Sequence, residues 1–181
     1  MRHFIALCCL VAFAALAAGE ATNAANATTP LTLAPELVLN LPTSWERLQP
    51  AGPRIAQYRI PGDAGTAAEF TVFSFGPQGA GDVEANLNRW LGQFAEDGRQ
   101  QERSTGTARH GEYHLAQITG TFNKAVGPPM AGKTEPQPGS AMLGVVLPGP
   151  QGPLYLKLTG PKELVLAQRA ALEAAIRKEG K

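Results

Sequence analysis

The sequence has little cysteine and no excess of charge of either sign. Only two of its 181 residues are cysteines, Cys8 and Cys9, and 16 basic against 15 acidic side chains give a formal net charge of +1. Such a chain lacks the basic surface with which proteins bind nucleic acid or anionic membranes. Both cysteines lie in an apolar run at the N-terminus, so the chain beyond that run can form no disulfide, thiol nucleophile or thiolate metal site. We therefore expect no nucleic-acid partner, and a stability that depends on the hydrophobic core.

The N-terminal run has the three parts of a secretory signal peptide. Arg2 supplies a positive charge, residues 4–18 are apolar, and small residues follow them. The apolar part, about 15 residues, is shorter than the ~20 that a membrane-spanning helix needs. We therefore predict a signal peptide over residues 1–27, cleaved between Gly19 and Ala27, and a periplasmic or secreted protein. The alternative is an uncleaved signal that keeps the protein at the membrane.

The remaining chain predicts one domain with two irregular segments. Residues 28–35 are small, polar and interrupted by proline, which is typical of a leader without regular structure. Residues 36–181 are long enough for a single α+β domain with its own core. Within this domain, residues 123–140 are rich in proline and glycine and show no periodicity, so we predict a mobile loop there.

A strand, a glycine-rich turn and an amphipathic helix follow one another in the middle of the chain. Residues 67–75 are rich in aromatic and β-branched side chains, which favours a strand. Three glycines of residues 76–81 form the turn, and Asp82 occupies the N-cap position of the helix. The helix is predicted over residues 83–94 because its apolar residues recur at helical spacing. Trp90 lies at the centre of this stripe and is expected to anchor the core.

Other runs complete the predicted architecture. Shorter apolar or alternating runs predict six further strands, at residues 36–41, 54–60, 105–109, 113–122, 141–147 and 154–159. A last helix begins near Pro161, and Trp45 is expected to cover an edge of the core. The order of strands, helix, strands, helix with short connections predicts an α+β fold, a mainly antiparallel sheet with two packed helices.

One cluster of histidines offers a possible metal site. His110, Glu112 and His114 are spaced two apart, so a continuous strand would present all three on one face. Two histidines and a carboxylate are ligands that zinc accepts. Gly111, however, marks a turn that interrupts the alternation, and no fourth ligand is evident. The preferred interpretation is an exposed hairpin end with no metal, and a metal-dependent hydrolase using these three residues is the alternative.

A second motif resembles a phosphate-binding loop. Residues 127–134 match the pattern of glycine, four residues, then Gly-Lys-Thr. The loop works through consecutive backbone N–H groups and a helix that begins at the lysine. Pro128 and Pro129 remove two of these donors, and the prolines after Thr134 prevent a helix. We therefore expect this segment to bind no nucleotide.

The flank of the predicted helix carries the residues that we expect to bind a partner. Asn86 and Gln93 lie beside Trp90, and Arg89 has no carboxylate four residues away. The glycines of the preceding turn would let another molecule approach the backbone closely. Asp82 repels anions at the helix N-terminus, so the sequence favours a small neutral ligand or a peptide-like partner, such as a protein of the cell envelope.

Several short motifs resemble a group of uncharacterised secreted bacterial proteins. The motifs are the glycine-rich turn, Asn86, Arg89-Trp90, Gln93-Phe94, Gly120-Thr121 and Leu158-Thr159-Gly160-Pro161. The likeness covers most of the chain from about Trp45 onward. The order of elements is also similar to that of the PsbP-like α/β/α sandwich, whose members include extracytoplasmic accessory proteins. This resemblance implies a role in binding or assembly and offers no catalytic residues to transfer.

The sequence therefore predicts a non-catalytic extracytoplasmic binding or accessory domain. The residues expected to bind are Asn86, Arg89 and Gln93, and no cofactor is expected. A serine nucleophile or a pair of catalytic carboxylates is not evident in the sequence.

Overall fold

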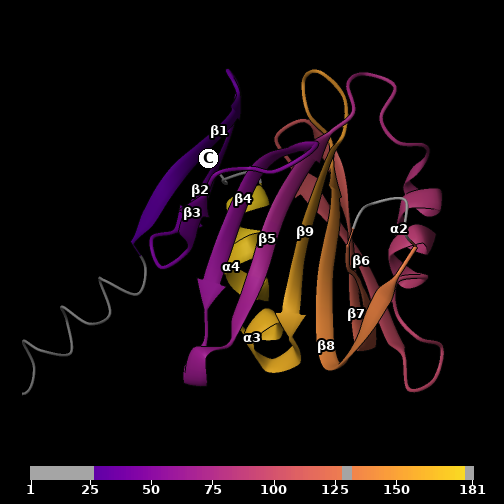
Figure 1. Ribbon diagram of the computed structural model, residues 1–181. Helices are drawn as coiled ribbons and strands as arrows, with labels where there is room; N and C mark the ends of the chain where they lie inside the picture. The colour runs from indigo at the N-terminus through magenta and orange to yellow at the C-terminus, as the bar shows by residue number, and fades with distance from the viewer. Residues whose placement is uncertain (1–26, 128–131, 178–181) are drawn as a thin grey trace, which may run out of the picture.

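The computed structural model describes residues 27–127 and 132–177 (Figure 1). The predicted signal peptide lies outside these residues, apart from Ala27. The strands are β1 (Thr28–Ala34), β2 (Leu37–Pro42), β3 (Glu46–Leu48), β4 (Arg54–Pro61), β5 (Ala67–Ser74), β6 (Gln100–Ala108), β7 (Gly111–Ala125), β8 (Thr134–Leu147) and β9 (Leu154–Pro161). The α-helices are α2 (Val83–Leu91), α3 (Lys162–Ala167) and α4 (Arg169–Ile176), and Asp63–Gly65 forms a short 3-10 helix. None of the described helices has the length and apolar character needed to cross a bilayer.

The strands form a large antiparallel sheet and a separate hairpin. Seven strands lie in the order β3-β4-β5-β9-β8-β7-β6, and every neighbouring pair is antiparallel. β1 and β2 pair with each other as a second, two-stranded sheet. The prediction of an α+β fold with a mainly antiparallel sheet is confirmed. The expected β4–β5 hairpin is also present, with Ile60 opposite Ala68.

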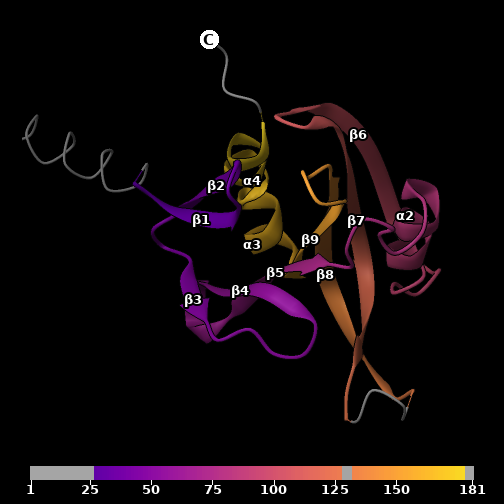
Figure 2. The same cartoon turned by 90° about the horizontal axis from the view of Figure 1, so that it is seen from above.

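The large sheet separates two hydrophobic clusters. In β8, alternate residues point to opposite faces, so Leu143 and Val145 join one cluster while Met142 and Val146 join the other. The first cluster lies under α3, α4 and the β1–β2 hairpin. The second lies under α2, which is on the opposite side of the sheet in Figure 2. The main core is therefore on the α3–α4 face.

The C-terminal helical segment is interrupted near its middle. α3 and α4 are separated at Gln168, whose side-chain Oε1 accepts a hydrogen bond from the indole N–H of Trp45 at 3.1 Å. Trp45 is buried, as expected, and its ring centroid lies 5.0 Å from that of Phe70. Val165 and Leu172 point into the core from the two helix segments. Trp45 thus joins the start of the sheet to the last helices.

The predicted leader at residues 28–35 is wrong. These residues begin with β1, which pairs with β2 from Thr28 opposite Pro42 to Ala34 opposite Leu37. Leu31 is only 2% exposed and belongs to the main core. One inward-pointing leucine and a hydrogen-bonded partner are enough for a strand, although small polar residues surround it. The folded domain therefore begins before residue 36.

Residues 123–140, predicted as an irregular loop, form strand at both ends of the segment. β7 continues to Ala125 and β8 begins at Thr134, so the two strands form a long hairpin arm. Pro136 and Pro138 are tolerated because this part of β8 pairs only with β7, while its pairing with β9 starts at Ser140. A proline without an N–H group is compatible with such a free edge.

Strand β6 is longer than the sequence pattern predicts. The strand predicted at residues 105–109 begins earlier, at Gln100, and Gln101 pairs with Ile118. β6 is the edge strand and most of its side chains are exposed, so it needs no apolar alternation. Backbone hydrogen bonds to β7 define it instead.

Candidate functional site

Helix α2 is fixed at its N-terminus by its own side chains. As predicted, Asp82 is the N-cap, and its Oδ1 accepts a hydrogen bond from the N–H of Ala85 at 2.7 Å. The amide nitrogen of Asn86 donates to the carbonyl oxygens of Ala80, Gly81 and Asp82, at 3.3, 3.3 and 2.8 Å. Asn86 is buried, and these contacts join the glycine-rich turn to the helix.

Helix α2 ends three residues earlier than predicted and is followed by a tight turn. The α-helix ends at Leu91, and Gly92 is its C-cap. The N–H groups of Gln93 and Phe94 bond to carbonyls three residues back, those of Trp90 and Leu91, both at 3.1 Å. Gln93 therefore lies in a turn just beyond the helix, where its side chain reaches the sheet.

Trp90 seats α2 on the sheet. Its side chain is buried with Leu87 and Phe94 in the second hydrophobic cluster. The indole lies against Gly144 of β8, where a Cβ atom would overlap the six-membered ring. Glycine at this position lets the helix approach the sheet closely. The prediction that Trp90 is a buried anchor is confirmed.

Helix α2 covers only part of its face of the sheet. Its apolar side chains pack on residues of β7 and β8, including Ala116, Ile118 and Met142. Strands β4 and β5 lie beyond the helix, and no described helix covers them on this side (Figure 2). Outward-facing residues of β5 and β9, among them Phe73 and Lys157, lie beside the flank of α2.

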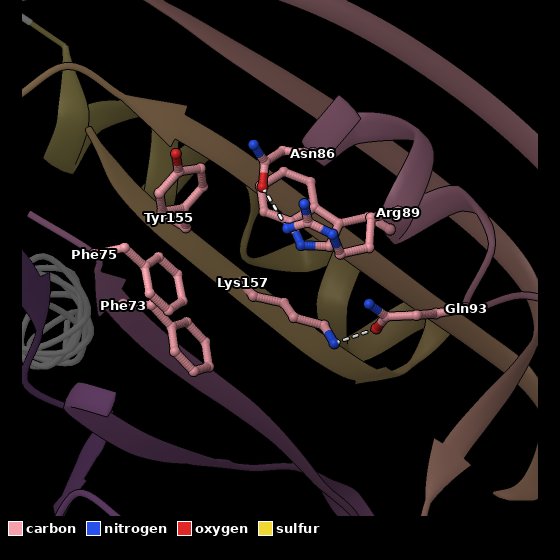
Figure 3. A pocket seen from close by; sticks show the side chains of 8 residues that line it. Phe73, Phe75, Asn86, Arg89, Gln93, Tyr155 and Lys157 are labelled. Atoms are coloured by element: carbon pink, nitrogen blue, oxygen red, sulfur yellow. Dashed lines mark hydrogen bonds between the residues drawn. The ribbon is translucent and has the colours of Figure 1, made fainter. Parts of the chain in front are cut away.

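A shallow depression lies at this junction. Its volume is about 160 Å³, and we call it the α2 depression. Its lining residues are Phe73, Phe75, Asn86, Arg89, Trp90, Gln93, Tyr155 and Lys157. Figure 3 shows the aromatic side chains of Phe73, Phe75 and Tyr155 on one side, the flank of α2 on the other and Lys157 between them. The structure thus brings together all three residues that the sequence predicts as binding residues.

Arg89 lies on the exposed flank of α2. One guanidinium nitrogen donates to Oδ1 of Asn86 at 2.8 Å and another to the carbonyl oxygen of Ala80 at 3.0 Å. These two contacts orient the side chain along the depression. Among the described residues Arg89 forms no ion pair, as its lack of a local carboxylate predicted.

Lys157 is the functional candidate that the sequence argument missed. It lies on β9, the central strand of the sheet, and is half-buried. Its Nζ donates to Oε1 of Gln93 at 2.5 Å and lies 5.0 Å from the centroid of the Phe122 ring. Burial lowers the pKa of Lys157 to about 8, while attraction to Glu69 raises it and repulsion from Arg54 lowers it further. The available signal was a lysine in the alternating run Leu-Tyr-Leu-Lys-Leu.

Aromatic side chains form the opposite wall. The rings of Phe73 and Phe75 are nearly parallel, at 5°, with centroids 6.3 Å apart. The ring centroid of Tyr155 lies 5.6 Å from that of Phe75. Phe75 is 48% exposed, although it is a large apolar side chain. The depression therefore offers apolar surface to solvent beside two cations.

A polar network borders this wall on β4 and β5. The guanidinium carbon of Arg54 lies 5.8 Å from the centroid of Phe73, and its Nε lies 3.8 Å from Oε1 of Glu69. Gln57 donates to the same Glu69 oxygen at 2.8 Å. Glu69 is therefore engaged with two residues of β4.

Asn86 uses both polar atoms of its side chain within the protein, whereas Gln93 uses its side-chain oxygen. The polar atoms of Asn86 bond to the turn and to Arg89. The oxygen of Gln93 is occupied by Lys157. Asn86 is thus a positioning residue for Arg89, and Gln93 is one for Lys157.

The glycine-rich turn packs against Tyr155 of strand β9. The N–H of Ala80 donates to the Tyr155 hydroxyl at 2.8 Å, and a Cβ on Gly79 would lie 2.7 Å from that oxygen. Gly79 has a φ of 62°, which glycine adopts without strain. The close approach expected for a partner is therefore made by β9.

The histidine cluster does not converge. The Nε2 atom of His110 lies 3.3 Å from the carbonyl oxygen of Glu36. The Nε2 atom of His114 lies 3.7 Å from Oε1 of Glu112. No group of three His, Cys, Asp or Glu side chains in the described residues is arranged to hold a metal ion. The turn at the start of β7 separates the side chains, as the glycine at position 111 indicated.

The segment that resembles a phosphate-binding loop is described only at its ends. Residues 128–131 lie outside the described part of the chain. Thr134 begins strand β8 instead of a helix. The segment therefore lacks the helix that a phosphate-binding loop uses to hold its ligand.

The chain forms an α+β domain with a mainly antiparallel sheet and a depression beside α2. Neither the protein-family models nor the curated proteins with which the chain was compared match it.

Proposed function

We propose that the protein is a non-catalytic binding or accessory domain that acts outside the cytoplasm, with the α2 depression as its binding site. One observation carries this proposal: exposed aromatic surface at Phe75 lies beside two cations, Arg89 and Lys157, that have no carboxylate partner among the described residues. Apolar surface with a few converging polar groups is typical of ligand sites.

The chemistry of the lining favours binding over catalysis. The charged residues that line the depression are Arg89 and Lys157, and both are bases. Hydrolysis by a nucleophile–base pair or by two carboxylates needs groups of a different kind within hydrogen-bonding distance. Binding by fixed cations and aromatic rings needs only what is present.

The proposed role also draws on the likeness to PsbP-like proteins. The antiparallel sheet with α2 on one face and α3–α4 on the other is the arrangement expected of an α/β/α sandwich. That likeness implies a role in binding or assembly outside the cytoplasm. An envelope protein or a small ligand is therefore the class of partner that we propose.

Export is tested by the mass of the mature protein. We expect cleavage between Gly19 and Ala27, so protein recovered from the periplasm or medium should lack Cys8 and Cys9. Intact-mass spectrometry and thiol titration measure this directly. Full-length protein in the cytoplasm, with both thiols present, would contradict the export prediction.

Binding at the depression is tested by a fragment screen. Neutral, cationic and anionic fragments are added to ¹⁵N-labelled protein, and backbone amide shifts are followed. We expect saturable shifts at Phe75, Gln93 and Lys157, and affinity about tenfold lower in Phe75→Ala, because a good part of the apolar contact is lost.

The matched control for Phe75→Ala is Leu48→Ala. Leu48 lies on β3, outside the depression, and is also an exposed large apolar residue, at 39%. Its replacement should leave fragment affinity unchanged. If no fragment shifts the depression, or if Leu48→Ala weakens binding as much as Phe75→Ala, the proposed site is wrong.

A further inference from the structure

The α2 depression contains two cations and no acid. Arg89 enters from the helix and Lys157 from the central strand β9, as Figure 3 shows. Elsewhere in the described chain, arginines such as Arg59 and Arg103 have carboxylate partners, at 2.9 and 2.6 Å. Two unpaired cations facing one depression favour a ligand of opposite charge.

Both cations retain free hydrogen-bond donors. A guanidinium group has five N–H donors. Arg89 donates one hydrogen bond to Asn86 and one to Ala80, each from a different nitrogen. Lys157 uses one of its three donors on Gln93. A planar carboxylate, with two oxygens, matches an arginine fork and accepts from a lysine as well.

The aromatic wall favours a flat apolar body. The rings of Phe73 and Phe75 are nearly parallel, and Tyr155 lies tilted beside Phe75, so three aromatic side chains line this side of the depression. Aromatic ligands gain from stacked or tilted contacts with such rings. Arg89 lies across the depression from the aromatic wall and Lys157 lies between them, so one ligand can contact the wall and both cations (Figure 3).

The size of the depression limits the ligand. Its volume of about 160 Å³ is below the range of about 300–1,000 Å³ that is usual for drug-sized molecules. A single ring with a short acidic chain is of suitable size. A nucleotide or a large polyanion is not.

Resting on the proposed function, we infer that the α2 depression binds a small aromatic carboxylic acid. Its carboxylate lies between Arg89 and Lys157, and its ring lies on Phe73 and Phe75. The ligand class is a free arylalkyl monocarboxylate. Phosphate and neutral aromatic compounds are the competing classes that the test separates.

The neutral ligand expected from the sequence rested on the position of Asp82. That carboxylate caps the N-terminus of α2 and bonds to Ala85. It does not line the depression, which lies along the flank and C-terminal end of the helix. Attraction of an anion into the depression depends instead on Arg89 and Lys157.

Binding should depend on the protonation of Lys157. The charged groups near its ammonium group are Glu69 on β5 and Arg54 on β4, with Arg89 of α2 lining the same depression. A carboxylic acid stays ionised above pH 6. Because only the protonated lysine attracts it, affinity should fall as the pH rises above about 8.

The test compares an acid with its neutral isostere. 3-Phenylpropionate, 3-phenylpropanamide, acetate and inorganic phosphate are titrated into ¹⁵N-labelled protein at pH 7 and pH 9.5. We expect 3-phenylpropionate to bind best at pH 7, about tenfold tighter than the amide, the usual gain from charge-assisted bonds. The same acid should bind about tenfold more weakly at pH 9.5.

Variants assign the contribution of each cation. Lys157→Met and Arg89→Gln should each weaken the binding of 3-phenylpropionate by about tenfold and leave the affinity for 3-phenylpropanamide unchanged. Lys157→Met should also remove the pH dependence of binding. Arg103→Gln is the control, because Arg103 pairs with Glu84 outside the depression.

Other outcomes would overturn the inference. If the acid and the amide bind with equal affinity, the depression binds ligands but does not select a carboxylate. Tighter binding of phosphate would mean a different class of anion. If neither phenyl compound shifts the depression, the carboxylate inference is wrong, and the fragment screen decides the proposed function independently.

Discussion

Replacing Trp90 with alanine is expected to lower the free energy of unfolding by about 3–5 kcal/mol, the usual cost of removing a large buried aromatic side chain. Trp90 is 6% exposed and packs with Leu87 and Phe94 of its own helix on residues of the sheet. Its loss leaves a cavity between α2 and the sheet. Urea or thermal unfolding of the purified variant measures the change.

Gly144 provides a specific control for this prediction. A side chain at Gly144 would overlap the indole of Trp90, so Gly144→Ala should cost about 1–3 kcal/mol in the otherwise unchanged protein. In the Trp90→Ala background the same change should cost little, because the obstructing ring is gone. Strictly additive effects of the two substitutions, or a loss below about 1 kcal/mol for Trp90→Ala, would contradict the packing described here.

Replacing Lys157 with methionine is expected to raise the free energy of unfolding at pH 7, on the order of 1–3 kcal/mol. The ammonium group is half-buried on the central strand, and this burial lowers its pKa from 10.5 to about 8 in the folded protein. The folded state therefore holds this proton less tightly than the unfolded state does. Methionine keeps most of the side-chain volume and removes the charge.

The same group makes stability depend on pH in a defined direction. Between about pH 8 and pH 10.5 the unfolded chain binds more protons at Lys157 than the folded protein, so stability should increase as the pH rises through this window. Below pH 8 the cost of burying the charge is fully present. Lys157→Met should remove this increase.

An exposed lysine is the control for Lys157→Met. Lys162 lies at the start of α3 and is exposed, so Lys162→Met should change neither the stability at pH 7 nor its slope. Chemical unfolding at intervals from pH 7 to pH 9.5 supplies both quantities. A destabilised Lys157→Met variant with the slope of the unchanged protein would show that the lysine stabilises the fold as a cation.

The sequence by itself determined the strand, turn and helix around Asp82 and Trp90. The cap, the helical spacing of apolar residues and the glycine-rich turn act over a few residues, so they can be recognised in the sequence. For the same reason, Asn86 and Arg89 were correctly expected on the helix, whereas Gln93 lies in the turn just beyond its C-terminus. The buried indole of Trp45 also follows from the area that tryptophan buries.

Only the tertiary structure decided which strands are neighbours. β9, the last strand in the sequence, lies between β5 and β8, and this order brings Lys157 beside Gln93 and places Phe73 in the lining of the same depression. Edge pairing likewise made strands of the polar residues 100–103 and of the proline-containing residues 134–140. Backbone hydrogen bonds between distant segments need no apolar periodicity, so the sequence pattern carries no mark of them. The site depends on such a long-range pairing, whereas the helix that flanks it depends on contacts within its own turns.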